Sequence, residues 1–228
     1  MYEIVTNSEM NEATIANLQP SSQRLRFTWG VVALLLTSAS PAGTVDEAQA
    51  AFARGEYKAA ADLLRPLANS GDAAALAELG DLYAIGQGVQ LDIVRAGQYW
   101  RMAAEKGIPK AMSSLAALYQ SGNGGLPKDE TLAVAWTTKA AENLFVPSML
   151  NLTARYANGI GVDKDLARAI AWATLATEYA GEPRIKTVAK RELQRLSTTA
   201  NPTDIERARE TTDSIRASIG THATPTTR

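Results

Sequence analysis

The sequence contains no cysteine and only one histidine, and these shortages leave almost no room for the familiar catalytic and metal sites. Without cysteine there is no disulfide, no thiolate nucleophile and no cysteine-ligated zinc. The single histidine, His222, lies in a polar stretch near the end of the chain. A histidine-dependent catalytic triad and a histidine-cluster metal site are therefore nearly excluded. We predict no catalytic residue, no metal site and no cofactor.

Aromatic residues are also few, at 6% of the 228 residues, whereas alanine supplies 41 of them. So much alanine, with few aromatic and β-branched residues, favours closely packed helices over a β-sandwich. The charges nearly cancel, since 23 Lys and Arg face 24 Asp and Glu, which gives a formal net charge of −1. We therefore expect no nucleic-acid partner.

Residues 1–42 have the features of a secretory signal peptide. Arg24 and Arg26 precede an apolar stretch at 27–36, and small residues follow at 40–42. The apolar stretch is shorter than the roughly 20 residues that a transmembrane helix needs. We predict cleavage after the last of these small residues and a periplasmic or secreted bacterial protein. Two alternatives stay open, namely a short uncleaved anchor that displays the body at the periplasmic face of the inner membrane, and a buried helix.

The body of the chain repeats itself every 36 to 37 residues. Each unit has a tyrosine, a Gly-x-Gly pair three residues later, an aspartate, an alanine four residues after the aspartate, and an aromatic residue three positions further on. These residues are Tyr83, Tyr119 and Tyr156; Gly86, Gly122 and Gly159; Asp92, Asp129 and Asp165; Ala96, Ala133 and Ala169; and Tyr99, Trp136 and Trp172. So many matched positions predict an architecture of stacked units.

Each unit is predicted to be a pair of helices. The Gly-x-Gly pair permits the positive φ of a helix C-terminus, and the aspartate that follows is expected to N-cap the second helix. Gly80, in the middle of a first helix, costs about 1 kcal/mol relative to alanine, which indicates that a neighbouring helix approaches closely there. We place Trp136 and Trp172 in the core, whereas Trp100, displaced by one position, is the tryptophan that we expect to be partly exposed.

This pattern resembles the Sel1-like repeat family, whose members are α/α solenoids related to tetratricopeptide repeats. The resemblance is carried by A-x3-L-G-x2-Y-x2-G-x-G-V-x2-D-x3-A-x2-Y-W-x2-A-A at 75–104, and the next two units keep most of it. A shorter unit precedes them at 46–71. The resemblance implies an all-α fold, a right-handed α/α superhelical solenoid of Sel1-like or tetratricopeptide-like helix pairs over 43–180. It also implies a non-enzymatic scaffold that docks a partner protein or an envelope complex, although fold alone does not carry function.

Beyond residue 180 the repeat decays, and two amphipathic helices over 181–219 are predicted to cap the last hydrophobic face of the solenoid. The second of them is expected to begin at Asn201-Pro-Thr-Asp204, with the asparagine as N-cap and the proline in the first turn. Residues 220–228 are expected to be disordered. The whole reading gives ten helices, at 46–54, 57–69, 73–85, 92–105, 109–121, 129–142, 146–158, 165–179, 183–196 and 202–217.

If one surface is functional, we expect it to be the concave one, which the first helix of each pair lines in solenoids of this class. The candidate partner-binding residues are those that the repeat offsets place on this side. They are Asp46, Ala77, Asp81, Lys110, Ser113, Gln120, Leu150 and Asn158. The side chains on this side of the repeats are mostly small or mildly polar, with few charges, and such a groove suits an extended peptide or an apolar helix of a partner protein.

Two other functions stay open. A glycan- or peptidoglycan-binding module would use Trp100 to stack on a sugar ring. A cell-wall-active enzyme is less favoured, because the Sel1-like proteins associated with penicillin hydrolysis carry paired cysteines, which this chain lacks. The glycine-rich turns are not phosphate loops, since no strand precedes them and no Gly-Lys-Ser/Thr follows.

Overall fold

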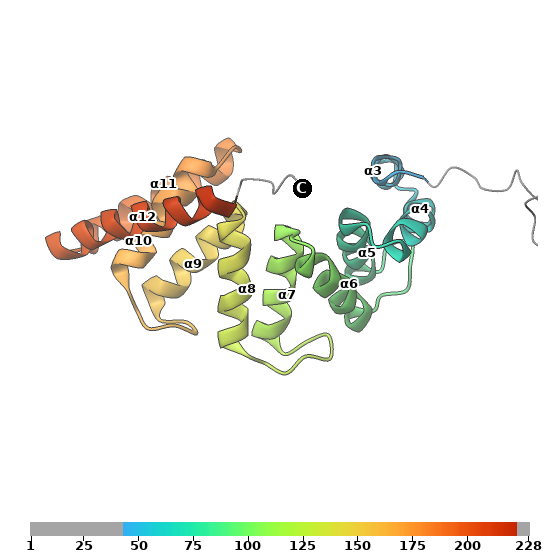
Figure 1. Cartoon of the computed structure of the whole chain (residues 1–228), viewed down its shortest axis with the longest axis horizontal. Helices are drawn as coiled ribbons and strands as arrows, with labels where there is room; N and C mark the ends of the chain where they lie inside the picture. The colour runs from blue at the N-terminus through green and yellow to red at the C-terminus, as the bar shows by residue number, and fades with distance from the viewer. Residues whose placement is uncertain (1–42, 223–228) are drawn as a thin grey trace, which may run out of the picture. The chain divides into compact units, whose positions relative to one another are not determined.

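The computed structural model describes residues 43–222, and all regular secondary structure in this range is helical (Figure 1). The helices are α3 (Val45–Ala53), α4 (Tyr57–Asn69), α5 (Ala73–Ile85), α6 (Ile93–Glu105), α7 (Pro109–Ser121), α8 (Glu130–Glu142), α9 (Val146–Asn158), α10 (Leu166–Tyr179), α11 (Pro183–Thr199) and α12 (Pro202–His222). The predicted all-α fold is confirmed. The predicted signal peptide, and residues 223–228 of the predicted tail, lie outside the described residues.

The first eight helices begin and end within one residue of the predicted bounds, but the last two are longer. Helix α11 continues to Thr199, and Ala200 after it is extended. No proline or glycine interrupts the helix before that point, and Pro202 disfavours helical backbone at the residue before it. Helix α12 continues to His222 and so includes the first three residues of the predicted disordered tail. That part of the tail prediction is wrong.

Consecutive helices pack on one another from α3 to α10, as a solenoid of helix pairs requires (Figure 1). The series ends where α11 and α12 both pack against α10, and α12 also contacts α8. Ala189 and Leu196 of α11 and Ala208 of α12 are at most 2% exposed. Asn201 caps α12, since its Oδ1 accepts the Asp204 backbone N–H at 2.8 Å. The two C-terminal helices therefore cover the end of the repeat array, as predicted.

The turns confirm the expected cap chemistry. The second helices α6, α8 and α10 each begin at an aspartate whose carboxylate accepts a backbone N–H three residues later, and the first helices α5, α7 and α9 each end at a glycine in the left-handed region. The distances are 3.0 Å for Asp92, 2.9 Å for Asp129 and 3.1 Å for Asp165, and the φ angles are 69° at Gly86, 72° at Gly122 and 73° at Gly159. These two devices fix where each helix stops and the next starts.

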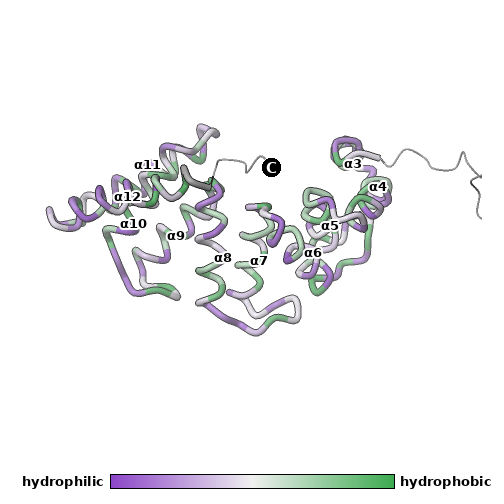
Figure 2. Tube along the Cα trace, in the orientation of Figure 1, coloured by the Kyte–Doolittle hydropathy of each residue, from purple (hydrophilic) through white to green (hydrophobic). Residues whose placement is uncertain are grey.

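Alanine fills the space between the helices. The repeated alanines of the second helices, Ala96, Ala103, Ala104, Ala133, Ala140, Ala141, Ala169 and Ala176, are at most 2% exposed. Figure 2 shows hydrophobic positions interleaved with hydrophilic ones along the helices instead of collected in one part of the chain. Trp172 is 4% exposed and belongs to the core as predicted. Trp136 packs against the core cluster but is only half-buried, with Lys139 Nζ 4.4 Å from its ring centroid.

The Trp100 side chain of helix α6 lies directly against Gly80 of α5. A Cβ built on Gly80 would lie 2.7 Å from Cδ1 of Trp100, so only glycine leaves room for that ring. The expected close approach is confirmed, and the approaching group is Trp100 itself.

Candidate functional site

The first helices α3, α5, α7 and α9 carry all the candidate partner-binding residues, and we call their accessible side chains the first-helix surface. Asp46, Lys110, Gln120 and Asn158 are exposed there, and Asp81, Ser113 and Leu150 are half-buried. Ala77 is 7% exposed and packs in the core, so it offers nothing to a partner. The offset placed Ala77 outward, but its side chain is one of the buried residues of the core cluster that spans the neighbouring helices.

Among these candidates, the structure joins Asp81 and Lys110. The Lys110 Nζ, at the start of α7, lies 2.6 Å from Oδ2 of Asp81 on α5. The second carboxylate oxygen of Asp81 accepts the indole N–H of Trp100 at 2.9 Å. Three helices of two successive units therefore meet at one carboxylate, which has a donor on each oxygen.

A second contact extends this arrangement toward the N-terminus. The Gln49 side-chain amide on α3 donates to Glu78 Oε1 on α5 at 2.8 Å. We call Gln49, Glu78, Asp81 and Lys110 the polar seam. It links the first helices of three successive units through side chains that stay partly accessible to solvent. The seam gives this surface a defined pattern of charge and hydrogen-bonding groups.

The Asp81 carboxylate raises the pKa of Lys110 above its ordinary value, first by their hydrogen bond and then by Coulomb attraction, to which Glu78 adds. A lysine whose pKa is raised by folding contributes stability that is fully present below its unfolded-state pKa. That contribution is lost only as the pH rises through the raised folded-state pKa. At neutral pH the Lys110 side chain is therefore charged.

The remaining candidates stay separate. Asn158 donates its side-chain amide to Ala154 O of its own helix at 2.8 Å, and Leu150 packs against the core cluster around Met149 and Trp172. Trp100 is half-buried, its ring lies over Gly80 and its N–H is taken by Asp81. This leaves little of Trp100 to serve as a platform for a sugar.

Sequence reasoning missed Gln49 and Glu78. The signal available for Glu78 was its spacing of three from Asp81, which puts both carboxylates on one side of α5. No pattern within one helix indicates Gln49, because its partner is 29 residues away on another helix.

Within the described residues there is no group of three or more acidic or histidine side chains arranged to hold a metal ion. None of the described helices is both long and apolar enough to cross a membrane.

A comparison with protein families identifies the repeats. The family model of the Sel1 repeat matches three successive segments, 73–108, 109–143 and 146–178. These segments are Sel1 repeats. They contain α5 to α10, so the α3–α4 pair and the capping helices flank them. Sel1 repeats generally mediate protein–protein interaction. No curated protein is similar enough to this chain to count as a match.

Two solved structures are similar to this chain, and the first of them agrees with the Sel1 assignment. A Sel1 repeat protein from Oxalobacter formigenes is 27% identical, with a TM-score of 0.60 over 66% of this chain and 59% of that one. The protective antigen c5321 of uropathogenic Escherichia coli, which displays an SLR fold, is 20% identical, with a TM-score of 0.49 over 74% of this chain and 44% of that one. The chain thus spans less than two thirds of the length of either protein.

Proposed function

We propose that this protein is a non-enzymatic scaffold that docks a partner protein on its first-helix surface. The three consecutive Sel1 repeats carry the proposal, because such repeats mediate protein–protein interaction. The polar seam supports the choice of surface. It presents fixed polar or charged side chains on three first helices, and these can align an extended peptide or a helix across successive units.

Site-specific photocrosslinking in intact cells tests the choice of surface. A photoreactive residue at Gln120, which is exposed on α7, is expected to give a discrete adduct with one partner. The same residue at Glu105, which is exposed at the end of α6, serves as the matched control. Equal labelling from both positions, or labelling from Glu105 alone, contradicts docking on the first-helix surface.

The proposal also places the protein outside the cytoplasm, on the sequence of residues 24–42. A mature N-terminus at or near Gly43 is then expected in protein recovered from the periplasm or the medium. Replacing Leu34 and Leu35 with arginine should keep the full-length chain in the cytoplasm, since each charge opposes insertion by roughly 2.5–3.5 kcal/mol. Export of that variant would overturn this part of the proposal without affecting the docking surface.

A further inference from the structure

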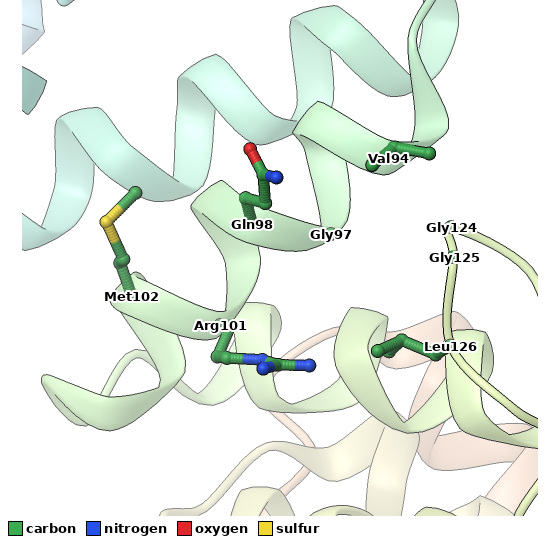
Figure 3. Close-up of a pocket in the computed structure, with 8 residues that line it drawn as sticks. All are labelled: Val94, Gly97, Gln98, Arg101, Met102, Gly124, Gly125 and Leu126. Carbon is green, nitrogen blue, oxygen red and sulfur yellow. The ribbon is translucent and has the colours of Figure 1, made fainter.

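A groove away from the polar seam lies between α6 and the turn that joins α7 to α8 (Figure 3). It has a volume of about 520 Å³. Its lining consists of Val94, Gly97, Gln98, Arg101 and Met102 from α6 with Gly124, Gly125 and Leu126 from the turn. Two of these apolar side chains, Val94 and Met102, remain 49% and 41% exposed, so a bound ligand could cover them. The groove shares no residue with the seam.

Two glycines line this groove, Gly97 and Gly125, and the neighbouring repeats lack both. Gly97 corresponds to Ala61 on α4 and to Val134 on α8, so the other second helices carry a side chain there. Gly125 is an additional residue. Asp129 lies ten positions after Tyr119, whereas the equivalent aspartate lies nine positions after its tyrosine in the other two repeats. The groove is therefore a feature of this repeat and not of the repeat fold.

One of the residues that line the groove, Arg101, carries a positive charge that no acidic side chain among the described residues neutralises. Figure 3 shows the Arg101 side chain extended toward Leu126, and among the described residues no acid pairs with it and none lines the groove. The equivalent arginine on α4, Arg65, is paired with Asp62, and the equivalent residue on α8 is Thr138. An apolar groove with one unpaired guanidinium is complementary to an apolar group that stands beside a carboxylate.

We propose that this groove binds an extended segment of a partner protein in which large apolar residues flank an Asp or Glu. The part of α6 from Val94 to Met102 is about 12 Å long at 1.5 Å per residue. An extended chain advances about 3.3 Å per residue, so about four residues span the groove. The carboxylate of the segment pairs with Arg101, and its apolar side chains contact Val94, Met102 and Leu126. This site is independent of the docking proposed for the first-helix surface.

Titration of the ¹⁵N-labelled protein with blocked peptides tests the site. The probe is acetyl-Ser-Leu-Glu-Leu-Ser-amide, read from the backbone amides of Gly124 and Gly125 and the side-chain amide of Gln98. We expect saturable shifts confined to these groups and their neighbours. The same peptide with Gln in place of Glu should bind about fivefold more weakly, which is the effect of one partly exposed ion pair.

Three variants locate the interaction. Arg101→Gln should bind the Glu peptide about fivefold more weakly and abolish the preference for Glu over Gln. Val94→Lys, which copies Lys58 of the preceding unit, should weaken both peptides alike. Arg184→Gln, at another exposed arginine, should bind like the unaltered protein and is the matched control. Helical circular dichroism checks that all three variants are folded.

Several results would overturn the proposal. Equal affinity for the Glu and Gln peptides, an unchanged preference in Arg101→Gln, or shifts elsewhere on the protein would each do so. A further probe is acetyl-Ser-Leu-Gln-Leu with a free C-terminal carboxylate. If the protein preferred this probe to the Glu peptide, the ligand of the groove would be the C-terminus of a partner chain and not an internal segment. None of these results bears on photocrosslinking from Gln120.

Discussion

The contacts between α6 and α7 and between α8 and α9, which we call junctions, involve equivalent positions of the repeat. The side chains at these positions are apolar in the first junction and charged in the second. At the first junction, Leu118 of α7 lies close to Gly97 and beside Gly124 of the turn that follows. At the second, the residue equivalent to Leu118 is Arg155, which is 3% exposed and lies 2.9 Å from Glu130. Glu130 is itself equivalent to Ile93.

Both junctions also have a glycine at the same position of the turn, Gly124 in the first and Gly161 in the second. A Cβ on Gly124 would lie 3.1 Å from both Leu118 and Ile93, and a Cβ on Gly161 would lie 3.2 Å from Arg155 and 3.1 Å from Glu130. The glycine thus lets each turn rest on the start of the preceding second helix. What lies beneath it is apolar packing in one repeat and an ion pair in the next.

The difference teaches that the backbone geometry of the repeat does not require one kind of contact. Arg155 is further held by Asn151 Oδ1 at 2.7 Å and by the Ile160 carbonyl at 3.3 Å, so its guanidinium is well satisfied. Such buried pairs often add little net stability over apolar packing, but removing one partner is costly. We interpret the pair as one that fixes which second helix meets which first helix.

The largest expected effect comes from breaking the polar junction. Arg155→Ala leaves a cavity and a partly buried Glu130 without its partner, and it should lower the free energy of unfolding by about 3–5 kcal/mol. Urea denaturation measures the change. If the free energy of unfolding fell by less than about 1 kcal/mol, water would be able to replace Arg155 as the partner of Glu130, and the ion pair would not be important for stability.

The double variant Arg155→Leu with Glu130→Ile sharpens the comparison, since it copies the apolar junction of Leu118 and Ile93. Its free energy of unfolding should lie within about 1–2 kcal/mol of that of the unaltered protein, because an apolar pair of similar volume can replace a buried ion pair. The single variant Arg155→Leu is the control and should be clearly less stable than the double one. Equal instability of both would show that the two junctions differ in backbone shape after all.

The helices were predictable from the sequence, and the junctions between them were not. Asp92, Asp129 and the Gly-x-Gly pairs act within a few residues of themselves, so their spacing indicates where helices start and stop. Arg155 and Glu130 are 25 residues apart, and their pairing depends on how α9 sits against α8. Ala77 was misplaced for the same reason, since its burial depends on the neighbouring helices of the array.

The next prediction concerns the free energy of unfolding after replacement of two tryptophans at equivalent positions. Trp172→Ala should cost about 3–5 kcal/mol, as for other emptied aromatic core sites. Trp136→Ala should cost clearly less, about 1–2 kcal/mol, because its ring is only half-buried and contacts Lys139 at the surface. Thermal unfolding of the two variants side by side gives the difference. A cost at Trp136 as large as that at Trp172 would mean that its exposed half is covered in solution.

A smaller effect is expected at the helix caps, which are alike in all three repeats. Asp129→Ala removes the acceptor of the Leu132 N–H and should cost about 0.5–2 kcal/mol. Asp165→Ala should cost more, because Asp165 also pairs with Arg207 of α12 at 3.1 Å. The same urea experiment compares them, and an equal loss at both positions would show that the contact to the capping helix is not significant.

The smallest expected effect is a gain in stability at α9. Ser148 is 1% exposed, and its hydroxyl has no hydrogen-bond partner among residues 43–222. The equivalent positions hold Ala75 and Ala111, both at most 1% exposed. An unsatisfied buried hydroxyl costs about 1 kcal/mol or more, and alanine also has the higher helix propensity. Ser148→Ala should therefore raise the free energy of unfolding by about 1 kcal/mol. The reverse change, Ala111→Ser, should lower it by a similar amount, since the environments match. If Ser148→Ala instead destabilised the protein while Ala111→Ser behaved as expected, the hydroxyl would have a partner in solution, and the junction at α9 would contain a second polar contact beside that of Arg155.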